Sequence, residues 1–311
     1  MLPTPDTSHV CYERVYEPAE DSFLLLDTLS SASETSWLRG RFSSAGPPPF
    51  VVEIGPGSGV VIAFVNAHAG VLFGPGSDSG SNTAVLTAAV DLNAHACRAT
   101  GETVRRAAKE ARGTRTGTGT YLGASRGDLA TALRPGSVDV LIFNPPYVPT
   151  PEMPQRPGQN RGDAIASDDA GEEEGEEVTD GFDGDSYLLA LSYAGGRDGM
   201  ETTDRLLADL PRVLSARGCA YVLLCAQNRP EEVKRRVREG YYWGGGDEEG
   251  DGGSCCCWRA ETVGSSGKTA GWEKLQIIRI WRDTEPAKDG GGGLVKTYNI
   301  ASQHVTSYHT A

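Results

Sequence analysis

Two consecutive prolines directly after an apolar run constrain the fold more than any other feature of the chain. The run covers residues 138–143, and the segment Asn144-Pro145-Pro146-Tyr147 follows it. Proline lacks an N–H donor and has a fixed φ, so it cannot continue a central strand. The run therefore predicts a buried strand that ends and turns at Asn144. Because ligands bind at the carboxyl ends of strands in an open α/β sheet, we expect this turn to line a binding site.

The turn carries groups that can hold a planar NH2 group. The Asn144 side-chain oxygen and the Pro145 carbonyl are two acceptors for the two hydrogens of such a group, and the Tyr147 ring can stack on its plane. An ordinary strand-ending turn with an Asn-Pro dipeptide is the alternative interpretation.

Strand patterns and helix patterns alternate along the whole chain. The expected strands cover residues 50–54, 84–90, 121–122, 138–143, 219–226 and 275–281. The expected helices cover residues 18–29, 60–65, 94–111, 186–194, 199–214 and 231–238, and a Ser- and Pro-rich linker lies between the first helix and the first strand. This alternation predicts an α/β fold with a doubly wound, mostly parallel sheet and helices on both faces.

Low-complexity segments interrupt what we expect to be a single domain. The expected layout is a tail at 1–14, one domain at 15–282 with insertions at about 70–83, 151–185 and 244–271, and a disordered tail at 283–311. Twelve acids against two arginines at 152–185, and four acids at 244–257, account for the net charge of −13. Such segments are typical of solvated loops, and the near-neutral remainder predicts no broad basic surface for nucleic acid.

The cysteines and the apolar runs indicate where the protein works. The seven cysteines form no CxxC pair and no zinc-like spacing with histidine, so we expect neither a metal site nor disulfides. Cys219 and Cys225 fall in an apolar strand and are expected in the core. The chain has no membrane-length apolar run and no signal-peptide pattern at its start, so we expect a soluble cytoplasmic protein, with the nucleus as a second location.

A glycine-rich loop follows the first expected strand with the pattern Glu53-x-Gly55-x-Gly57-x-Gly59. Glycines there allow a tight turn and a close approach of the backbone to a ligand. The loop alone fits NAD enzymes, flavin enzymes and methyltransferases, because its GxGxG spacing differs from the dinucleotide fingerprint GxGxxG. Pro56 removes an N–H that a pyrophosphate would need, which favours a ligand without phosphates. A purely structural left-handed turn is the alternative.

Two carboxylates stand at the ends of the next two expected strands. Asp91 ends the second strand and can accept both ribose hydroxyls of a nucleoside. Asp128, which precedes Leu129, ends the third strand, where its carboxylate or the adjacent backbone N–H can contact an exocyclic amine of the base. For both aspartates, capping of a following helix is the alternative interpretation.

Five segments in this order resemble the HemK-like glutamine methyltransferases, most closely their short eukaryotic release-factor branch. They are Val15-Tyr16-Glu17-Pro18-Ala19-Glu20-Asp21-Ser22, Glu53-Ile54-Gly55-Pro56-Gly57-Ser58-Gly59, Asp91-Leu92-Asn93, Asn144-Pro145-Pro146-Tyr147-Val148 and Tyr193-Ala194-Gly195-Gly196-Arg197-Asp198-Gly199. The resemblance covers most of residues 12–240 and 272–282. The insertions and the tail are longer than the family needs.

The resemblance implies a class I methyltransferase with a seven-stranded Rossmann-like sheet and S-adenosyl-L-methionine as cofactor. The implied substrate is the side-chain amide nitrogen of the Gln in the Gly-Gly-Gln loop of a translation release factor. The residues that match the family's catalytic loop are Asn144, Pro145, Pro146 and Tyr147, and those that match its cofactor site are Ser22, Glu53, Gly55, Gly57, Gly59, Asp91, Asp128, Leu129 and Asn144. The short members work as heterodimers with a small zinc-binding activator protein, which would dock along the exposed third strand near Tyr121 and Leu122.

Other functions fit some of these motifs. In a nucleic-acid adenine N6-methyltransferase, the adenine would present a similar NH2 group to the same loop. Such an enzyme would need a basic surface that binds the nucleic acid and a target-recognition domain. A methyltransferase of other proteins or small molecules, or a binding module that has kept the fold without the activity, would also carry these residues. Salt-dependent DNA binding would favour the first alternative, and failure to bind the cofactor would favour the last.

Overall fold

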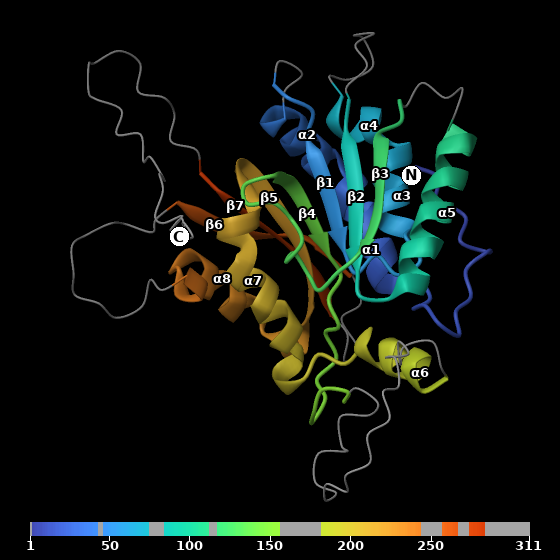
Figure 1. The fold of residues 1–311 in the computed structure, drawn as a ribbon. Helices are drawn as coiled ribbons and strands as arrows, with labels where there is room; N and C mark the ends of the chain where they lie inside the picture. The colour runs from blue at the N-terminus through green and yellow to red at the C-terminus, as the bar shows by residue number, and fades with distance from the viewer. Residues whose placement is uncertain are drawn as a thin grey trace, which may run out of the picture.

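Seven strands form one sheet in the described part of the chain (Figure 1). The computed structural model describes residues 2–42, 46–74, 84–111, 117–155, 182–243, 257–266 and 274–283. The strands lie in the order β3-β2-β1-β4-β5-β7-β6. Their bounds are β1 Phe50–Ile54, β2 Leu86–Asp91, β3 Thr120–Arg126, β4 Val138–Phe143, β5 Leu214–Cys225, β6 Trp258–Ser265 and β7 Leu275–Arg282. Strands β1 to β5 pair in parallel and β7 pairs antiparallel with both β5 and β6, so the expected mostly parallel, doubly wound sheet is confirmed.

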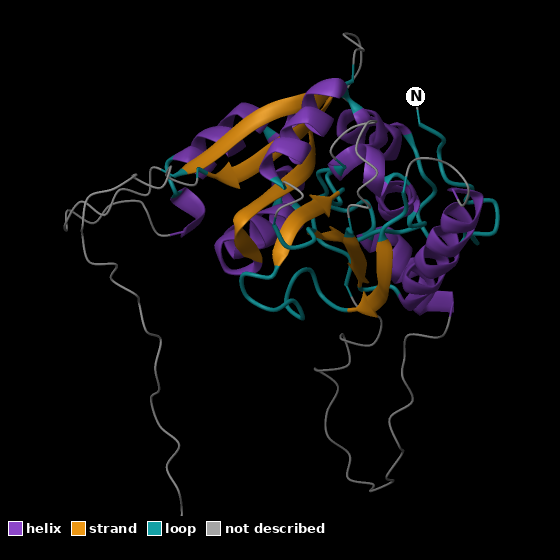
Figure 2. Cartoon of the chain, turned by 90° about the horizontal axis from the view of Figure 1, so that it is seen from above, coloured by secondary structure: helices purple, strands orange, loops and turns teal. Residues whose placement is uncertain are grey.

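Helices cover both faces of this sheet (Figure 2). One face packs against α1 Glu20–Ser30, α2 Ala32–Arg41, α3 Val60–Ala67, α4 Ala69–Phe73 and α5 Ala94–Ala111, and the other against α7 Glu201–Val213 and α8 Pro230–Arg238. Helix α6 Phe182–Leu191 belongs to neither layer and lies beyond the carboxyl ends of the parallel strands (Figure 1). None of the helices in the described ranges is both long and apolar enough to cross a membrane.

Strand β4 is the centre of the core, because all six of its residues are buried. Val140 and Ile142 face the α1–α5 layer, while Leu141 and Phe143 face α7 and α8. A strand covered on both sides needs apolar residues at consecutive positions, which explains the apolar residues at 140–143. Cys219 and Cys225 of β5 are buried in the same core, as the sequence predicts.

The expected linker between the first helix and the first strand is wrong over residues 32–41, which form helix α2. Ser31 caps this helix by accepting a hydrogen bond from the Glu34 N–H (3.2 Å). Leu38 is buried, and the Trp37 ring packs edge-on against Trp281 with 5.7 Å between centroids. Tertiary packing thus makes a helix of a segment whose serines alone favour turns.

The expected insertion at 244–271 is wrong in its second half, because residues 258–265 form the edge strand β6. Trp258 and Ala260 alternate toward the core, and only the flanking glycines and cysteines give the segment its low-complexity character. The expected tail at 1–14 also packs on the domain, since Val10 forms a small apolar cluster with Val15 and with Ala96 of α5. Residues 75–83, 156–181, 244–256 and 267–271, within the expected insertions, and 284–311 of the expected tail lie outside the described ranges.

Candidate active site

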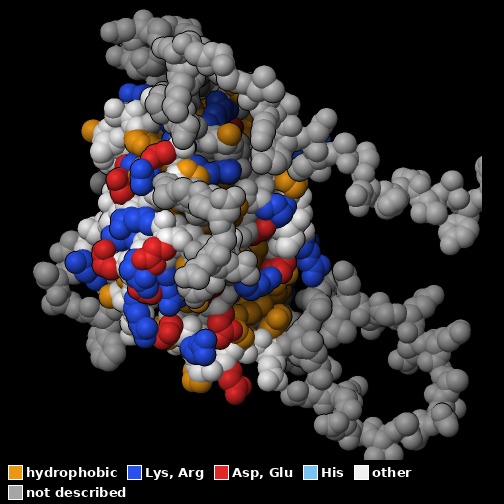
Figure 3. All heavy atoms as spheres, turned by 90° about the vertical axis from the view of Figure 1, so that its left-hand side faces the viewer, with side chains coloured by type: hydrophobic (Ala, Val, Ile, Leu, Met, Phe, Trp, Pro, Cys, Tyr) orange, Lys and Arg blue, Asp and Glu red, His pale blue; other side chains and the backbone are white. Residues whose placement is uncertain are grey.

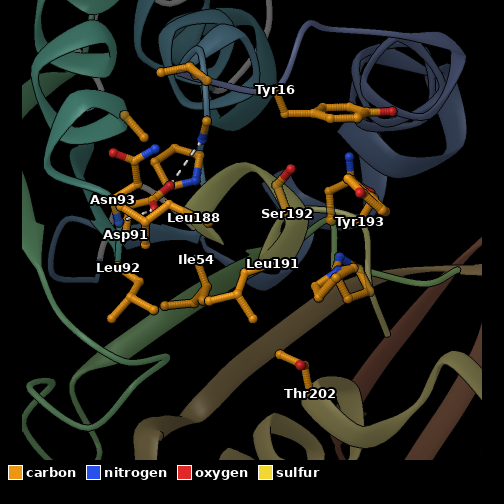
Figure 4. Close-up of a pocket in the computed structure, with 18 of the residues that line it drawn as sticks. Tyr16, Ile54, Asp91, Leu92, Asn93, Leu188, Leu191, Ser192, Tyr193 and Thr202 are labelled. Atoms are coloured by element: carbon orange, nitrogen blue, oxygen red, sulfur yellow. Dashed lines mark hydrogen bonds between the residues drawn. The ribbon is translucent and has the colours of Figure 1, made fainter. Parts of the chain in front are cut away.

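A cavity of about 510 Å³ opens at the carboxyl ends of β1, β2 and β4 (Figure 4). Six parts of the chain line it: the segment at 14–22, the glycine loop, the end of β2, the turn after β3, the loop after β4 and helix α6. Of the residues that the sequence analysis assigns to a site, all but Gly59 lie in its wall, namely Ser22, Glu53, Gly55, Gly57, Asp91, Asp128, Leu129, Asn144, Pro145, Pro146 and Tyr147. The volume suits a single nucleoside-sized ligand.

The glycine loop has two different functions in the fold. Gly55 and Gly57 have positive φ (62° and 54°) and line the cavity, so their backbone is open to a ligand. Gly59 also has positive φ (79°), but a Cβ there would lie 2.6 Å from the Thr100 Cα of α5. Gly59 therefore lets α5 approach the loop and lies outside the cavity wall, which corrects its expected place in the site.

Asp91 is held at the end of β2 by two backbone donors. Its Oδ2 accepts from the Gly57 N–H (3.2 Å) and its Oδ1 from the Asn93 N–H (2.8 Å). Burial raises the pKa of this carboxyl to about 6, against which the backbone N–H donors act. The helix-capping alternative for Asp91 is wrong, because Asn93 caps α5 by accepting from the His95 N–H (2.8 Å). The Asp91 carboxylate is thus left facing the cavity.

Glu53 lies deeper, at the junction of β1 and α3. It is 2% exposed, and its Oε2 accepts from the Ile62 N–H (2.8 Å) at the first turn of α3. Burial raises the pKa of Glu53 to about 8, with a smaller contribution in the same direction from the nearby Asp91 carboxylate. At neutral pH Glu53 is therefore mainly protonated, which leaves Asp91 as the carboxylate that titrates at mildly acidic pH in this part of the wall.

Asp128 and Leu129 form the rim of the cavity after β3. Leu129 has a positive φ of 48°, which is unusual for a non-glycine residue and turns the chain toward the cavity. The Asp128 carboxylate accepts from Arg205 of α7 at 2.5 Å, and both side chains are about half exposed. Residues 128–133 form turns, so the helix-capping alternative is wrong for Asp128 as well.

The loop after β4 presents a buried acceptor without a partner. The Asn144 Oδ1 is buried and makes no hydrogen bond within the described residues. The Tyr147 hydroxyl donates to Asp21 Oδ2 of α1 at 3.5 Å, and the Ser22 hydroxyl donates to Asp21 Oδ1 at 3.2 Å. A buried acceptor normally has a donor, so Asn144 is poised for an N–H or O–H of a ligand. An ordinary strand-ending turn does not account for it.

Helix α6 and the residues after it close the cavity, which the sequence analysis did not predict. In Figure 4, Asp91 and Asn93 lie at one end of the cavity and Tyr16 lies toward the other. Leu188, Leu191, Ser192 and Tyr193 line the wall between them. The apolar run at 187–191 was visible in the sequence, but the acidic segment before it separated it from the other motifs. No group of three or more metal-ligating side chains occurs among the described residues.

The strand order with the antiparallel β7, together with the cavity at the glycine loop, defines a class I methyltransferase. Methyltransferase HEMK2 of Mus musculus is 32% identical over 243 residues, 76% of this chain and 85% of the relative. The eRF1 methyltransferase catalytic subunit mtq2 of Schizosaccharomyces pombe is 30% identical over 289 residues, 91% and 96% of the two chains. A solved structure of a SAM-dependent methyltransferase from Aquifex aeolicus aligns with a TM-score of 0.35 at 11% identity, over 85% of this chain and 98% of that one. No family model matches the chain.

These relatives show that the chain belongs to the HEMK2/mtq2 family of methyltransferases. It is a methyltransferase that uses S-adenosylmethionine. The cavity fits this cofactor on three observations: a buried Asp91 carboxylate at the end of β2, open space around Gly55, where a Cβ would meet nothing within 4 Å, and apolar walls at Ile54 and Leu129.

Proposed function

We propose that this enzyme methylates the side-chain amide nitrogen of the Gln in the Gly-Gly-Gln loop of a translation release factor. The observation that carries the proposal is the buried Asn144 Oδ1 in the cavity wall beside Pro145, which has no hydrogen-bond partner among the described residues. A primary amide brings two N–H donors in one plane, and these two acceptors match them. The relative from Schizosaccharomyces pombe, an eRF1 methyltransferase subunit, supports the same class of substrate.

The chemical task of the loop is orientation. An amide nitrogen is a weak nucleophile because its lone pair is delocalised into the carbonyl group. When the Asn144 Oδ1 and the Pro145 carbonyl each accept one N–H, the nitrogen is fixed in position, and these acceptors stabilise the positive charge that develops on it. The bound cofactor supplies an electrophilic methyl group on a sulfonium. The N–C bond would form as the bond between the methyl group and sulfur breaks, which would leave a neutral thioether. The nitrogen would lose one proton to water as this happens, so no general base is needed before attack.

The remaining wall residues would hold the cofactor. Asp91 would accept the ribose hydroxyls, and the Asp128–Leu129 turn would contact the adenine. Gly55 and Gly57 allow the backbone to approach the ligand, and Ser22 would contribute a hydroxyl from the start of α1. Protonated Glu53 would keep a second negative charge away from Asp91.

A small zinc-binding activator protein is the partner that we propose for this enzyme. Strand β3 is an edge of the sheet, since β2 is its only neighbour among the described strands. Leu122 on β3 is 58% exposed, which is unusual for a leucine in a sheet and leaves apolar surface for a partner to cover. A release-factor substrate would place the complex in the cytoplasm, where translation ends.

Methyl transfer from labelled S-adenosylmethionine tests the proposed function. The full chain, co-expressed with the activator protein, is offered a release factor with the Gly-Gly-Gln loop or with Gly-Gly-Asn in its place. We expect label on the Gln protein and none on the Asn protein, because one missing methylene withdraws the amide from the Asn144 acceptor. Label on neither protein, but on DNA or RNA adenine, would overturn the proposal. Among the described residues that Figure 3 shows on this side, Lys and Arg side chains lie next to Asp and Glu, and Arg235 and Arg236 both pair with Glu232, which does not favour such a substrate.

A further inference from the structure

Asn228 is a buried amide behind the catalytic loop, on the side away from the cavity. It is 2% exposed and ends the short helix η3 Ala226–Asn228 that follows β5. Its Nδ2 donates to the Tyr147 carbonyl (3.0 Å) and to the Asp198 carbonyl (2.9 Å), and its Oδ1 accepts from the Cys225 N–H (2.8 Å). Backbone N–H groups only donate and carbonyls only accept, so this network allows one orientation of the amide.

Two glycines let the turn at 195–199 press against the same loop. A Cβ at Gly199 would lie 2.1 Å from the Tyr147 carbonyl oxygen and 2.5 Å from Asn228 Nδ2. A Cβ at Gly195 would lie 2.4 Å from the Pro146 carbonyl oxygen. The carbonyls of the loop therefore pack against the backbone of this turn. Two side chains donate to the Tyr147 carbonyl: the Asn228 amide at 3.0 Å and, more weakly, the Cys225 thiol at 3.9 Å.

We propose that Asn228 is a positioning residue for methyl transfer, which fixes the Asn144 and Pro145 acceptors through the Tyr147 carbonyl. Before the loop, Phe143 is paired in the sheet with β1 and β5. Between Phe143 and Tyr147, Pro145 and Pro146 have fixed φ values, so few torsions remain free. After the loop, backbone hydrogen bonds join Val148 to Tyr193 (3.2 Å) and to Gly195 (2.8 Å). The Asn228 hydrogen bond to the Tyr147 carbonyl fixes the stretch between these two ends. The inference rests on the proposed function for the identity of the amide substrate.

Asn228 affects kcat and does not affect the binding of the cofactor. It is not among the residues that line the cavity, so it touches neither cofactor nor substrate. The residues proposed to hold the cofactor's ribose and adenine lie at the ends of β2 and β3, in other parts of the chain. A displacement of about 1 Å of a catalytic group can cost roughly 10²-fold in rate. Loss of the Asn228 hydrogen bonds is therefore expected in kcat and not in the cofactor dissociation constant.

The test compares Asn228→Ala with a matched control. Asn66 of α3 is also buried (1% exposed) and donates to Thr87 Oγ1 (2.8 Å), but it does not contact the catalytic loop. We expect Asn228→Ala to lower kcat roughly 10²-fold while the cofactor affinity, measured by calorimetry, stays within about threefold. Asn66→Ala should lower stability while kcat stays near that of the wild type. Equal falls of kcat in the two variants, or an unchanged kcat in Asn228→Ala, would overturn the proposal.

Asn228→Asp adds a readout that a merely structural residue would not give. Its carboxylate would face the carbonyls of Tyr147 and Asp198, whereas its protonated form can donate one hydrogen bond again. At saturating cofactor, kcat relative to the wild type should rise as the pH falls from about 8 to about 6. A flat ratio would contradict the role.

Hydrogen exchange separates failure of this inference from failure of the proposed function. If the wild type does not methylate the Gly-Gly-Gln protein, the substrate assignment fails, but the amides of Tyr147 and Val148 still report the loop. Faster exchange at these two amides in Asn228→Ala than in Asn66→Ala supports the positioning role. Equal exchange in the two variants refutes it.

Discussion

The affinity for S-adenosylmethionine should depend on pH through Asp91. Burial raises the pKa of this carboxyl to about 6. Ribose hydroxyls donate hydrogen bonds, so they bind the carboxylate and oppose its protonation. The affinity should therefore be highest above pH 6 and fall at more acidic pH.

The size of the effect follows from the pKa. If only the ionised form of Asp91 binds, the dissociation constant increases about twofold at pH 6 and about tenfold between pH 7 and pH 5, or roughly 1.4 kcal/mol. Glu53, whose pKa is raised to about 8, stays protonated over this range and adds no second step. Without cofactor, the free energy of unfolding depends on pH in the opposite direction. The folded state binds more protons at Asp91 than the unfolded state does, so the contribution of Asp91 to stability falls as the pH rises from 3.8 toward 6.

Isothermal titration calorimetry between pH 5 and pH 7 measures this dependence. The range lies below the titration of the cofactor's α-amine, which has a pKa near 8. Asp91→Asn is the control, because it keeps the size of the side chain but cannot titrate. It should bind weakly at pH 7 and lose the tenfold step. A flat affinity in the wild type, or the same step in Asp91→Asn, would refute the assignment of Asp91 to the ribose.

Three further substitutions separate the parts of the enzyme. Asn144→Ala should lower kcat by roughly 10²–10³-fold with nearly intact cofactor affinity; a parallel loss of binding in calorimetry would contradict its role. Arg279→Leu leaves the buried Glu34 carboxylate without the guanidinium that contacts it at 2.6 Å, so denaturant unfolding should show a loss of about 3–5 kcal/mol. A loss below about 1 kcal/mol would show that the Arg279–Glu34 ion pair contributes little to the free energy of unfolding. Leu122→Glu on the edge strand β3 should prevent co-purification with the zinc-binding activator while the affinity of the isolated chain for cofactor is kept; continued co-purification would place the partner elsewhere.

The sequence was sufficient for those parts of the fold whose signals are local. The apolar run at 138–143 and the prolines after it identified the central strand and its end, because φ and donor loss act within the residue itself. The glycine loop and Asp91 were also found from local signals, namely the spacing of the glycines and the position of Asp91 at the end of a strand. Strand β6 was not found, because Trp258 and Ala260 are only two inward residues between glycine-rich segments.

The parts that the sequence could not predict depend on contacts between distant segments. Gly59 looks like its neighbours in the loop, and only its distance to Thr100, in a helix 41 residues later in the chain, shows that it serves packing. Helix α2 packs against a strand far along the chain, since Glu34 pairs with Arg279 and the Trp37 ring packs on Trp281. Asn228 carries no motif of its own, so nothing in its neighbourhood pointed to the loop that it holds.

The two halves of the site have separate supports, which predicts that binding and turnover can be disturbed independently. Thr100 and Thr103 of α5 donate to the carbonyls of Gly57 (3.3 Å) and Ser58 (2.6 Å), so the glycine loop is held from the α1–α5 side of the sheet. The catalytic loop is held by Asn228, which follows β5. Since no described hydrogen bond of Asn228 reaches the glycine loop, substitutions at the two supports should add in free energy. A strongly non-additive Thr103→Val, Asn228→Ala double variant would show instead that the sheet transmits strain between the halves.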